Sequence, residues 1–253
     1  MIPRVIPALL LQDGGLVKTV AFRDARYVGD PINTVRIFND KQVDEIVLLD
    51  IGATRTGRGP DEAAIEQIAA EAFMPVGYGG GVTSLAQARR LIQLGVEKVV
   101  INTAAIDDPA LIREIADVLG SSTIVVSMDA QRRPDGTYEV RARGATQATG
   151  RDARAHAEAM AAAGAGELLL QSIDRDGSMA GYDLELVRQV ASAVEIPVVA
   201  CGGAGSLEDV ASVISEGGAS AAAAGSLFVF HGKHRAVLVT YPSYERRVAA
   251  LAR

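Results

Sequence analysis

The sequence predicts an α/β protein, a (β/α)8 TIM barrel built from two similar half-barrels, with residues 1–253 forming one domain. Three observations support this prediction. Short apolar runs alternate with longer amphipathic stretches, which is the pattern of βα units around a parallel sheet. The chain has 253 residues, of which 49% are hydrophobic and 22% charged, enough for one barrel with a large core. In addition, the second half of the chain repeats the first.

The predicted strands are four to eight residues long and rich in Val, Ile, Leu and Ala. In chain order they are Arg4–Leu11, Glu45–Ile51, Val76–Gly79, Lys98–Asn102, Thr123–Asp129, Glu167–Ser172, Val198–Cys201 and Ala219–Ala224. The predicted helices between them are Ile32–Asp40, Pro60–Ala72, Leu85–Leu94, Pro109–Leu119, Asp152–Ala163, Asp183–Ala193 and Leu207–Glu216, and an irregular tail ends in Tyr244–Leu251. Ser84 and Ser206 suit helix N-caps. This number of units favours a closed barrel, although periodicity by itself also fits an open sheet.

The internal repeat becomes visible when the chain is shifted by 122 residues, which places Pro75 on Pro197. Without gaps, this shift matches Val76 with Val198, Gly80-Gly81 with Gly202-Gly203, Ser84-Leu85 with Ser206-Leu207, Ile92 with Ile214, and Gly95 with Gly217. Chance similarity in a chain rich in Gly and Ala is the alternative. We interpret the repeat as two related half-barrels.

Composition excludes several classes of function. A net charge of −6, 4% aromatic residues and no Trp argue against a nucleic-acid partner. The single Cys201 excludes an intramolecular disulfide and a cysteine-based zinc site, and no cofactor or metal motif is present. The apolar run Val5–Leu11 is too short for a signal peptide, and nothing approaches the roughly 18 apolar residues of a membrane span. We therefore expect a cytoplasmic protein without a membrane partner.

Two glycine-rich turns carry the strongest signal for ligand binding. Gly79-Gly80-Gly81 and Gly202-Gly203-Ala204-Gly205 each follow a predicted strand and precede a predicted helix. Glycine lets main-chain N–H groups approach an anion, and the helix N-terminus adds unpaired hydrogen-bond donors. Each turn therefore indicates a phosphate-binding loop. A tight turn that needs glycine for positive φ is the structural alternative.

One strand after each turn, small polar residues follow at the same rim of the barrel, and an Asp-Gly turn follows the sixth strand. The alternative for that turn is an ordinary surface loop. The predicted phosphate-binding residues are Gly80, Gly81, Asn102, Thr103, Asp176, Gly177, Gly202, Gly203, Gly225 and Ser226. Because the two groups would face each other across one mouth, the sequence predicts a small-molecule ligand with a phosphate at each end.

Many of these residues also lie in motifs of a known family. The motifs are Arg4-Val5-Ile6-Pro7, Asp13-Gly14, Gly29-Asp30-Pro31, Leu49-Asp50-Ile51, Gly79-Gly80-Gly81, Ile101-Asn102-Thr103-Ala104-Ala105, Ser172-Ile173-Asp174-Arg175-Asp176-Gly177, Gly181-Tyr182-Asp183 and Gly202-Gly203-Ala204-Gly205. Across nearly the whole chain they resemble the cyclase subunit of imidazole glycerol phosphate synthase. The resemblance implies a glutaminase partner at the N-terminal face of the barrel and passage of ammonia through the barrel to the opposite mouth.

In that family two aspartates at the mouth act as general acid and base. One of them corresponds to Asp129, whereas the other corresponds to Leu10, which has no titratable group. Lys18 and Asp50 match family positions that support the catalytic site, so the resemblance implies Asp129, Lys18 and Asp50 as the catalytic group. Each of the three could instead be a structural or solvated charge.

The resemblance also implies an ammonia gate at the barrel floor. Its four residues, at the starts of strands one, two, four and six, are Arg4, Glu45, Lys98 and Glu167. Two cations and two anions there would neutralise one another. A ring that merely closes the floor is the alternative, because barrel bottoms often serve stability.

Three segments, including the tail Gly225–Leu238, look like a paralogous branch associated with acetamidino-sugar synthesis for bacterial surface polysaccharides. The other two are Leu9–Thr19 and Val28–Asn33. This branch implies a separate sugar amidotransferase as a further partner. His231, His234 and Arg235 in the tail could form a partner or ligand surface, or simply a solvated loop.

The leading hypothesis is therefore a barrel subunit of a glutamine-dependent amidotransferase complex, one that conducts ammonia and cyclises weakly or not at all. The alternative is a genuine ammonia-dependent cyclase, a lyase of histidine biosynthesis. A third hypothesis is the sister isomerase of the same pathway. That enzyme also uses two aspartates, so Leu10 argues equally against this hypothesis. The fourth hypothesis is a purely structural barrel that binds phosphate without catalysis or conduction of ammonia.

Overall fold

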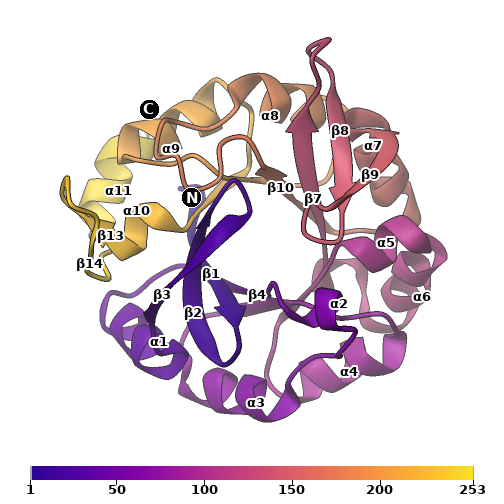
Figure 1. The fold of residues 1–253 in the computed structure, drawn as a ribbon, viewed down its shortest axis with the longest axis horizontal. Helices are drawn as coiled ribbons and strands as arrows, with labels where there is room; N and C mark the ends of the chain where they lie inside the picture. Colours follow the sequence, from indigo (N-terminus) through magenta and orange to yellow (C-terminus); the bar gives the residue numbers. More distant parts are fainter. Residues whose placement is uncertain (1, 253) are drawn as a thin grey trace.

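The computed structural model describes residues 2–252 and shows the predicted barrel (Figure 1). Its eight parallel strands are β1 (Arg4–Gln12), β4 (Ile46–Asp50), β5 (Val76–Gly79), β6 (Lys98–Ile101), β7 (Ile124–Arg132), β10 (Glu167–Ser172), β11 (Val198–Cys201) and β12 (Ala221–Ala224). Each pairs with the next around the ring, and pairing of β10 with β7 closes it. The prediction of a closed barrel is confirmed.

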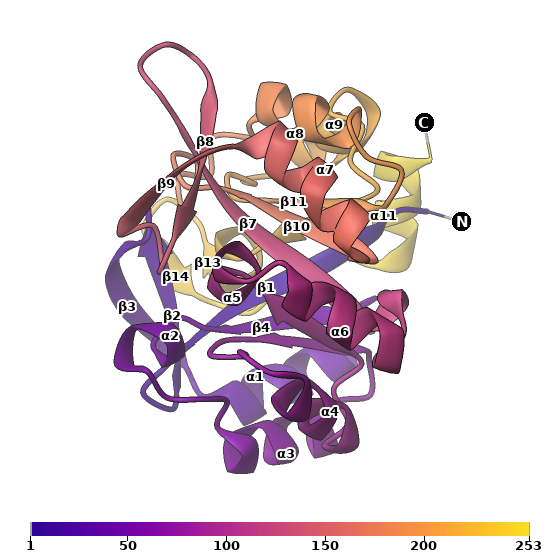
Figure 2. The same ribbon diagram turned by 90° about the vertical axis from the view of Figure 1, so that its right-hand side faces the viewer.

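The helices surround the ring and cover its outer face (Figures 1 and 2). They are α1 (Pro31–Asp40), α3 (Glu62–Glu71), α4 (Leu85–Gln93), α6 (Ala110–Leu119), α7 (Ala153–Ala163), α8 (Leu184–Ala191), α9 (Leu207–Ser215) and α11 (Tyr244–Leu251). Ser84 and Ser206 are N-caps as predicted, and Ser206 forms a capping box with Asp209. The buried faces of these helices and the outward side chains of the strands form the main apolar core.

The inside of the barrel is a second, smaller core of mostly small side chains. Its members are Ile6, Ala8, Val47, Val100, Val125, Leu169, Val199, Cys201, Ala221 and Ala223. Along β1 the alternation of a strand puts Arg4, Ile6, Ala8 and Leu10 on this inner face, from the floor to the mouth. Strand β1 thus carries both Arg4, a predicted gate residue, and Leu10, which corresponds to one of the two family aspartates.

Two hairpins at the mouth were not predicted from the sequence. After β1 the chain forms β2 (Gly15–Val20) and β3 (Arg23–Gly29), which lie across the mouth in Figure 1. Strand β7 continues past Asp129 and pairs with β8 (Tyr138–Ala142), which pairs with β9 (Gln147–Asp152). Much of β3 and β9 is exposed, so these strands lack the apolar alternation that would have indicated them.

Short helices follow three strands at the mouth, and the tail returns to the floor. The short helices are α2 (Ala53–Thr56), α5 (Thr103–Asp107) and α10 (Ser226–Val229), and a 3-10 turn (Ser121–Thr123) precedes β7. The tail then forms a small hairpin, β13 (Phe230–His231) and β14 (Ala236–Val237), before α11. Figure 2 shows α11 at the same end as the N-terminus, opposite the mouth hairpins.

Within residues 2–252 no helix has the length and apolar character needed to cross a membrane.

Candidate functional site

The two predicted phosphate half-sites lie on opposite sides of the barrel mouth. The first follows β5 and β6, and the second follows β11 and β12. In the closed ring β5 is four strands from β11, and β6 is four strands from β12. Because all eight strands are parallel, both groups lie at the carboxyl ends of their strands.

The glycines of the two turns make equivalent close contacts, as expected of repeated halves. A side chain on Gly80 would lie 2.7 Å from the carbonyl oxygen of Asp50, and one on Gly202 would lie 2.8 Å from that of Ser172. Asp50 and Ser172 end the two strands, β4 and β10, that the shift of 122 residues superimposes. Each turn therefore needs glycine because the neighbouring strand end leaves no room for a side chain.

A cavity of about 440 Å³ opens beside the second half-site. Its lining includes Lys18 and Leu10 together with the predicted residues Asp176, Gly177, Gly202, Gly203, Gly225 and Ser226. None of the predicted residues of the first half-site lines it. The structure thus brings six of the ten predicted phosphate-binding residues around one cavity.

The polar side chains of the first half-site are engaged within the protein. The Thr103 hydroxyl accepts a hydrogen bond of 3.0 Å from the main-chain N–H of Arg143, which lies in the turn between β8 and β9. The Asn102 amide donates to Asp129 Oδ2 at 2.9 Å, while its own oxygen is buried without a partner among the described residues. The Asn102 amide and the Thr103 hydroxyl therefore each already make a contact within the protein.

Lys18 lies buried at the mouth, on β2, with only 8% of its surface exposed. Its ammonium group donates to the Ala8 carbonyl at 2.5 Å and lies beside Gly225. Burial lowers the pKa of Lys18 to about 8, against a weaker opposing effect of the Asp176 carboxylate. Lys18 thus brings a buried amine to the lining of the mouth cavity.

Asp129 lies on the inner face of β7 and is 6% exposed. Burial raises the pKa of Asp129 to about 7, although the hydrogen bond from Asn102 acts in the opposite direction. A carboxyl group that titrates near neutral pH can both accept and donate a proton. In the ring, β7 is four strands from β1, so Asp129 and Leu10 project from opposite walls of the mouth.

Asp50 and Asp176 are occupied by structural contacts. Asp50 Oδ1 accepts the N–H groups of Gly52 and Ala53 at 2.9 and 3.0 Å, and its Oδ2 pairs with Arg58 at 2.8 Å. Asp176 Oδ2 accepts the Thr19 hydroxyl at 2.8 Å and the Phe22 N–H at 3.1 Å, which fastens the β2–β3 hairpin over the mouth. Both carboxylates shape the site through its loops.

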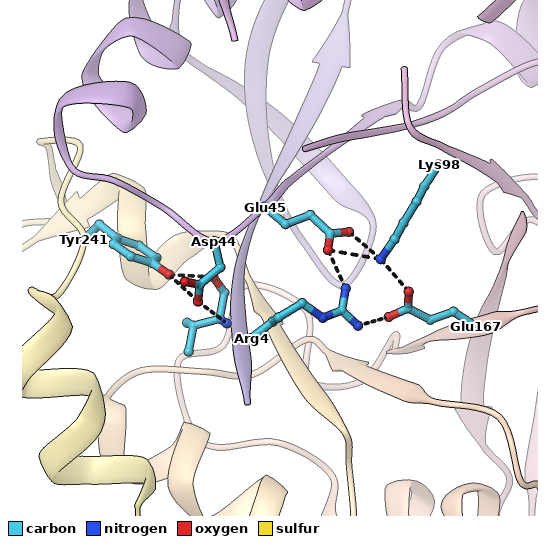
Figure 3. A network of polar contacts seen from close by, with 7 residues as sticks. Arg4, Asp44, Glu45, Lys98, Glu167 and Tyr241 are labelled. Carbon is cyan, nitrogen blue, oxygen red and sulfur yellow. Dashed lines mark hydrogen bonds and ion pairs between the residues drawn. The ribbon is translucent and has the colours of Figure 1, made fainter. Parts of the chain in front are cut away.

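The four predicted gate residues form a closed ring at the barrel floor (Figure 3). Arg4 donates to Glu45 and, at 2.5 Å, to Glu167. Lys98 donates to Glu45 at 3.0 Å and to Glu167 at 2.6 Å. Each cation thus bridges both carboxylates, and the ring closes the floor.

Behind this ring lies a second cavity, of about 290 Å³, lined mainly by Ile6, Val47, Val100, Val125, Leu169 and Val199. The mouth cavity is lined by the next inward residues of four of the same strands, which are Ala8, Leu49, Gln171 and Cys201. The residues that line the two cavities are thus successive inward positions on these four strands. The barrel axis is therefore largely apolar between floor and mouth.

Some residues at the mouth were missed by the sequence analysis. Gln171 is 6% exposed and lines the cavity beside Asp129, its partner in the pairing of β10 with β7. The alternation Glu167, Leu169, Gln171 along β10 could have indicated it. Thr19 and Phe22 gave no such signal, because their partner Asp176 lies in a distant loop, and Arg58 lies in an irregular segment without periodicity.

The tail residues singled out from the sequence lie away from the cavity lining. His231 and His234 are exposed at the β13–β14 hairpin, and Arg235 is half-buried there. Within residues 2–252, no cluster of three or more His, Cys, Asp and Glu side chains is arranged to hold a metal ion.

Comparison with known proteins identifies the family. A family model described as histidine biosynthesis protein matches residues 4–235. A protein of Pseudomonas aeruginosa, provisionally named imidazole glycerol phosphate synthase subunit hisF2, is 52% identical over 243 residues, which cover 96% of this chain and 97% of that protein. A Vibrio vulnificus protein provisionally named subunit hisF3 is 44% identical, over 98% of this chain and 96% of its own length. The imidazole glycerol phosphate synthase subunit HisF of Alkaliphilus metalliredigens is 43% identical, over 90% of each chain. This chain therefore belongs to the histidine biosynthesis protein family, among the proteins similar to the cyclase subunit HisF.

Proposed function

We propose that this barrel is the ammonia-conducting subunit of a glutamine-dependent complex and that it cyclises weakly or not at all. A glutaminase would bind at the N-terminal face, and ammonia would pass the ring of Arg4, Glu45, Lys98 and Glu167. At the mouth, a phosphate-bearing ligand would be held by the glycine turns and Lys18. The observation that carries the proposal is Leu10, which projects into the mouth opposite Asp129.

Leu10 matters because ring closure by the family's mechanism needs proton transfer at two places. Asp129 supplies one group with a pKa of about 7. The opposite wall presents a leucine side chain that is 7% exposed and cannot hold a proton. A positioned acid or base typically contributes about 10²–10⁴-fold in rate, so the loss of one would leave little cyclase turnover.

Conduction has separate support. The ring at the floor is complete, and on four strands the residues lining the floor cavity and the mouth cavity are successive inward positions, such as Ile6 and Ala8. A neutral ammonia molecule loses less by entering an apolar passage than an ammonium ion does, because burying an unpaired charge is costly. The arrangement favours passage of neutral ammonia through the barrel and keeps dissolved ions out of it.

For the acceptor we propose a sugar acetamido group that a separate amidotransferase converts to acetamidino. The support is the resemblance of the tail Gly225–Leu238 to a branch linked with such sugars, together with the numbered names of two relatives, hisF2 and hisF3. In the structure this tail begins at the mouth, where α10 and the β13–β14 hairpin follow Gly225. It therefore lies at the end from which ammonia would leave.

A test of lost cyclisation compares the wild type with Leu10→Asp, using the cyclase substrate and ammonium salt. We expect the wild type to turn over at least 100-fold more slowly than a histidine-pathway cyclase assayed in parallel, and Leu10→Asp to recover at least tenfold. Leu49→Asp, which places the same charge on the neighbouring strand at the mouth, should recover nothing. Wild-type turnover within tenfold of the reference cyclase would refute the proposal.

The genuine cyclase remains a second candidate because of one observation. Lys18 and Asp129, with pKa values of about 8 and about 7, both lie at the mouth and could exchange protons near neutral pH. This candidate predicts that the wild type complements a histidine auxotroph and that Lys18→Met does not. Failure of the wild type to complement at high expression would eliminate it.

A further inference from the structure

The C-terminal segment of the chain is tied to the barrel floor, next to the ring of Arg4, Glu45, Lys98 and Glu167. Tyr241 reaches the start of β1, where its hydroxyl donates to the Val5 carbonyl at 2.8 Å. The same hydroxyl lies 3.2 Å from Asp44 Oδ2 (Figure 3). Val5 and Asp44 are 236 and 197 residues away from Tyr241 in the chain, so the end of the sequence joins two strand starts.

Asp44 is the centre of this contact. Its Oδ2 accepts the main-chain N–H of Val5 at 3.1 Å and Arg247 Nη1 at 2.5 Å. Both main-chain groups of Val5 are thus held, the N–H by Asp44 and the carbonyl by Tyr241. Val5 directly follows the ring residue Arg4, and Asp44 directly precedes the ring residue Glu45.

Arg247 is buried to an extent that is unusual for arginine. It is 3% exposed, and its guanidinium lies 4.9 Å from the ring centre of Tyr241 and 5.7 Å from that of Tyr244. A buried cation needs a charged partner, and Asp44 provides it. The position of Asp44, and with it the start of β4, therefore depends on a helix that lies outside the barrel wall.

We infer that Asp44, Tyr241 and Arg247, here called the floor latch, are positioning residues for the ring. The guanidinium of Arg4 bridges two carboxylates, so a small displacement of either strand start breaks one of its bonds. The latch holds the residue beside Arg4 and the residue beside Glu45. The inference rests on the proposed function only in taking the ring as the entrance for ammonia.

The latch can be tested on the isolated barrel with Arg247→Met, using Arg246→Met as a matched control. Arg246 is the preceding residue of α11, is exposed, and loses the same charge. The probe is the ¹⁵N signal of the Lys98 ammonium group, which is favourable because the chain has only four lysines. We expect exchange of its protons with water to be slowed while both carboxylates hold Lys98.

We expect Arg247→Met and Tyr241→Phe to speed exchange of the Lys98 ammonium protons at least fivefold, and Arg246→Met to leave it within twofold of wild type. Thermal unfolding and far-UV circular dichroism establish that each variant is folded. A folded Arg247→Met barrel with unchanged Lys98 exchange would overturn the inference, whatever its melting temperature. Failure of the wild type to bind a glutaminase would instead count against the proposed function, and the Lys98 signal would still decide on the latch.

Discussion

The ammonium group of Lys18 occupies the space that a side chain on Gly225 would need. Lys18 comes from the β2–β3 hairpin, whereas Gly225 follows β12, and they meet over the Ala8 carbonyl. The glycine therefore makes room for a buried cation beside the mouth cavity. This contact connects the β2–β3 hairpin with the carboxyl end of β12.

Gly225→Ala should displace Lys18 from the Ala8 carbonyl. We expect a loss of about 1–3 kcal/mol in the free energy of unfolding, because the added methyl group overpacks a filled site. The pKa of Lys18 should rise from about 8 toward its usual 10.5 as the amine regains water. Urea unfolding and the ¹⁵N titration of Lys18 measure both effects. Gly77→Ala is the control, since a methyl group there makes only ordinary contacts of 3.5 Å or more.

Asp129→Asn should change how stability depends on pH. The folded pKa of Asp129 is raised from 3.8 to about 7, so its contribution to stability is complete below pH 3.8 and is lost as the pH rises through 7. One pKa unit corresponds to about 1.4 kcal/mol, so from pH 5 to pH 8 the wild type should lose about 2–3 kcal/mol relative to Asp129→Asn. Urea unfolding at the two pH values tests this, and a constant difference between the proteins would contradict it.

Asp176→Ala should release the β2–β3 hairpin from the mouth, because it removes the acceptor of the Thr19 hydroxyl and the Phe22 N–H. Limited trypsin digestion should then cut at the exposed Arg23 and Arg26 at least tenfold faster. Asp174→Ala is the matched control, since Asp174 accepts the N–H of Arg132 on β7 instead. Equal cleavage of the hairpin in both variants would show that Asp176 does not hold it.

Glu167→Ala should be costly, because it leaves Arg4 and Lys98 to share Glu45 in a largely buried ring. Breaking a buried pair typically costs about 3–5 kcal/mol. Glu71→Ala, which breaks the exposed pair with Arg36, should cost far less, because water screens an exposed ion pair. Chemical denaturation of both variants compares them, and similar losses would mean that the ring behaves as a surface network.

Much of the barrel and the outline of the site could be predicted because they depend on local patterns. Alternation along short runs indicated all eight barrel strands, and the repeat of Gly80-Gly81 in Gly202-Gly203 indicated two turns at one mouth. Four residues meet at the floor because each begins a parallel strand or directly precedes one, namely Arg4, Glu45, Lys98 and Glu167. Burial of alternate side chains in a closed ring is a short-range requirement, so the sequence expresses it directly.

Only the tertiary structure decided which polar groups meet across long distances in the chain. The sequence suggested a ligand contact for Asp176, and packing of the barrel fastens the Asp176 carboxylate to Thr19, which is 157 residues away. The same packing also brings Arg247 to Asp44, which is 203 residues away. Such pairs produce no periodic pattern in the sequence, because packing of the whole barrel brings their loops and the tail together. A strand or a helix N-cap, by contrast, depends on a few neighbouring residues, so the sequence indicates it directly.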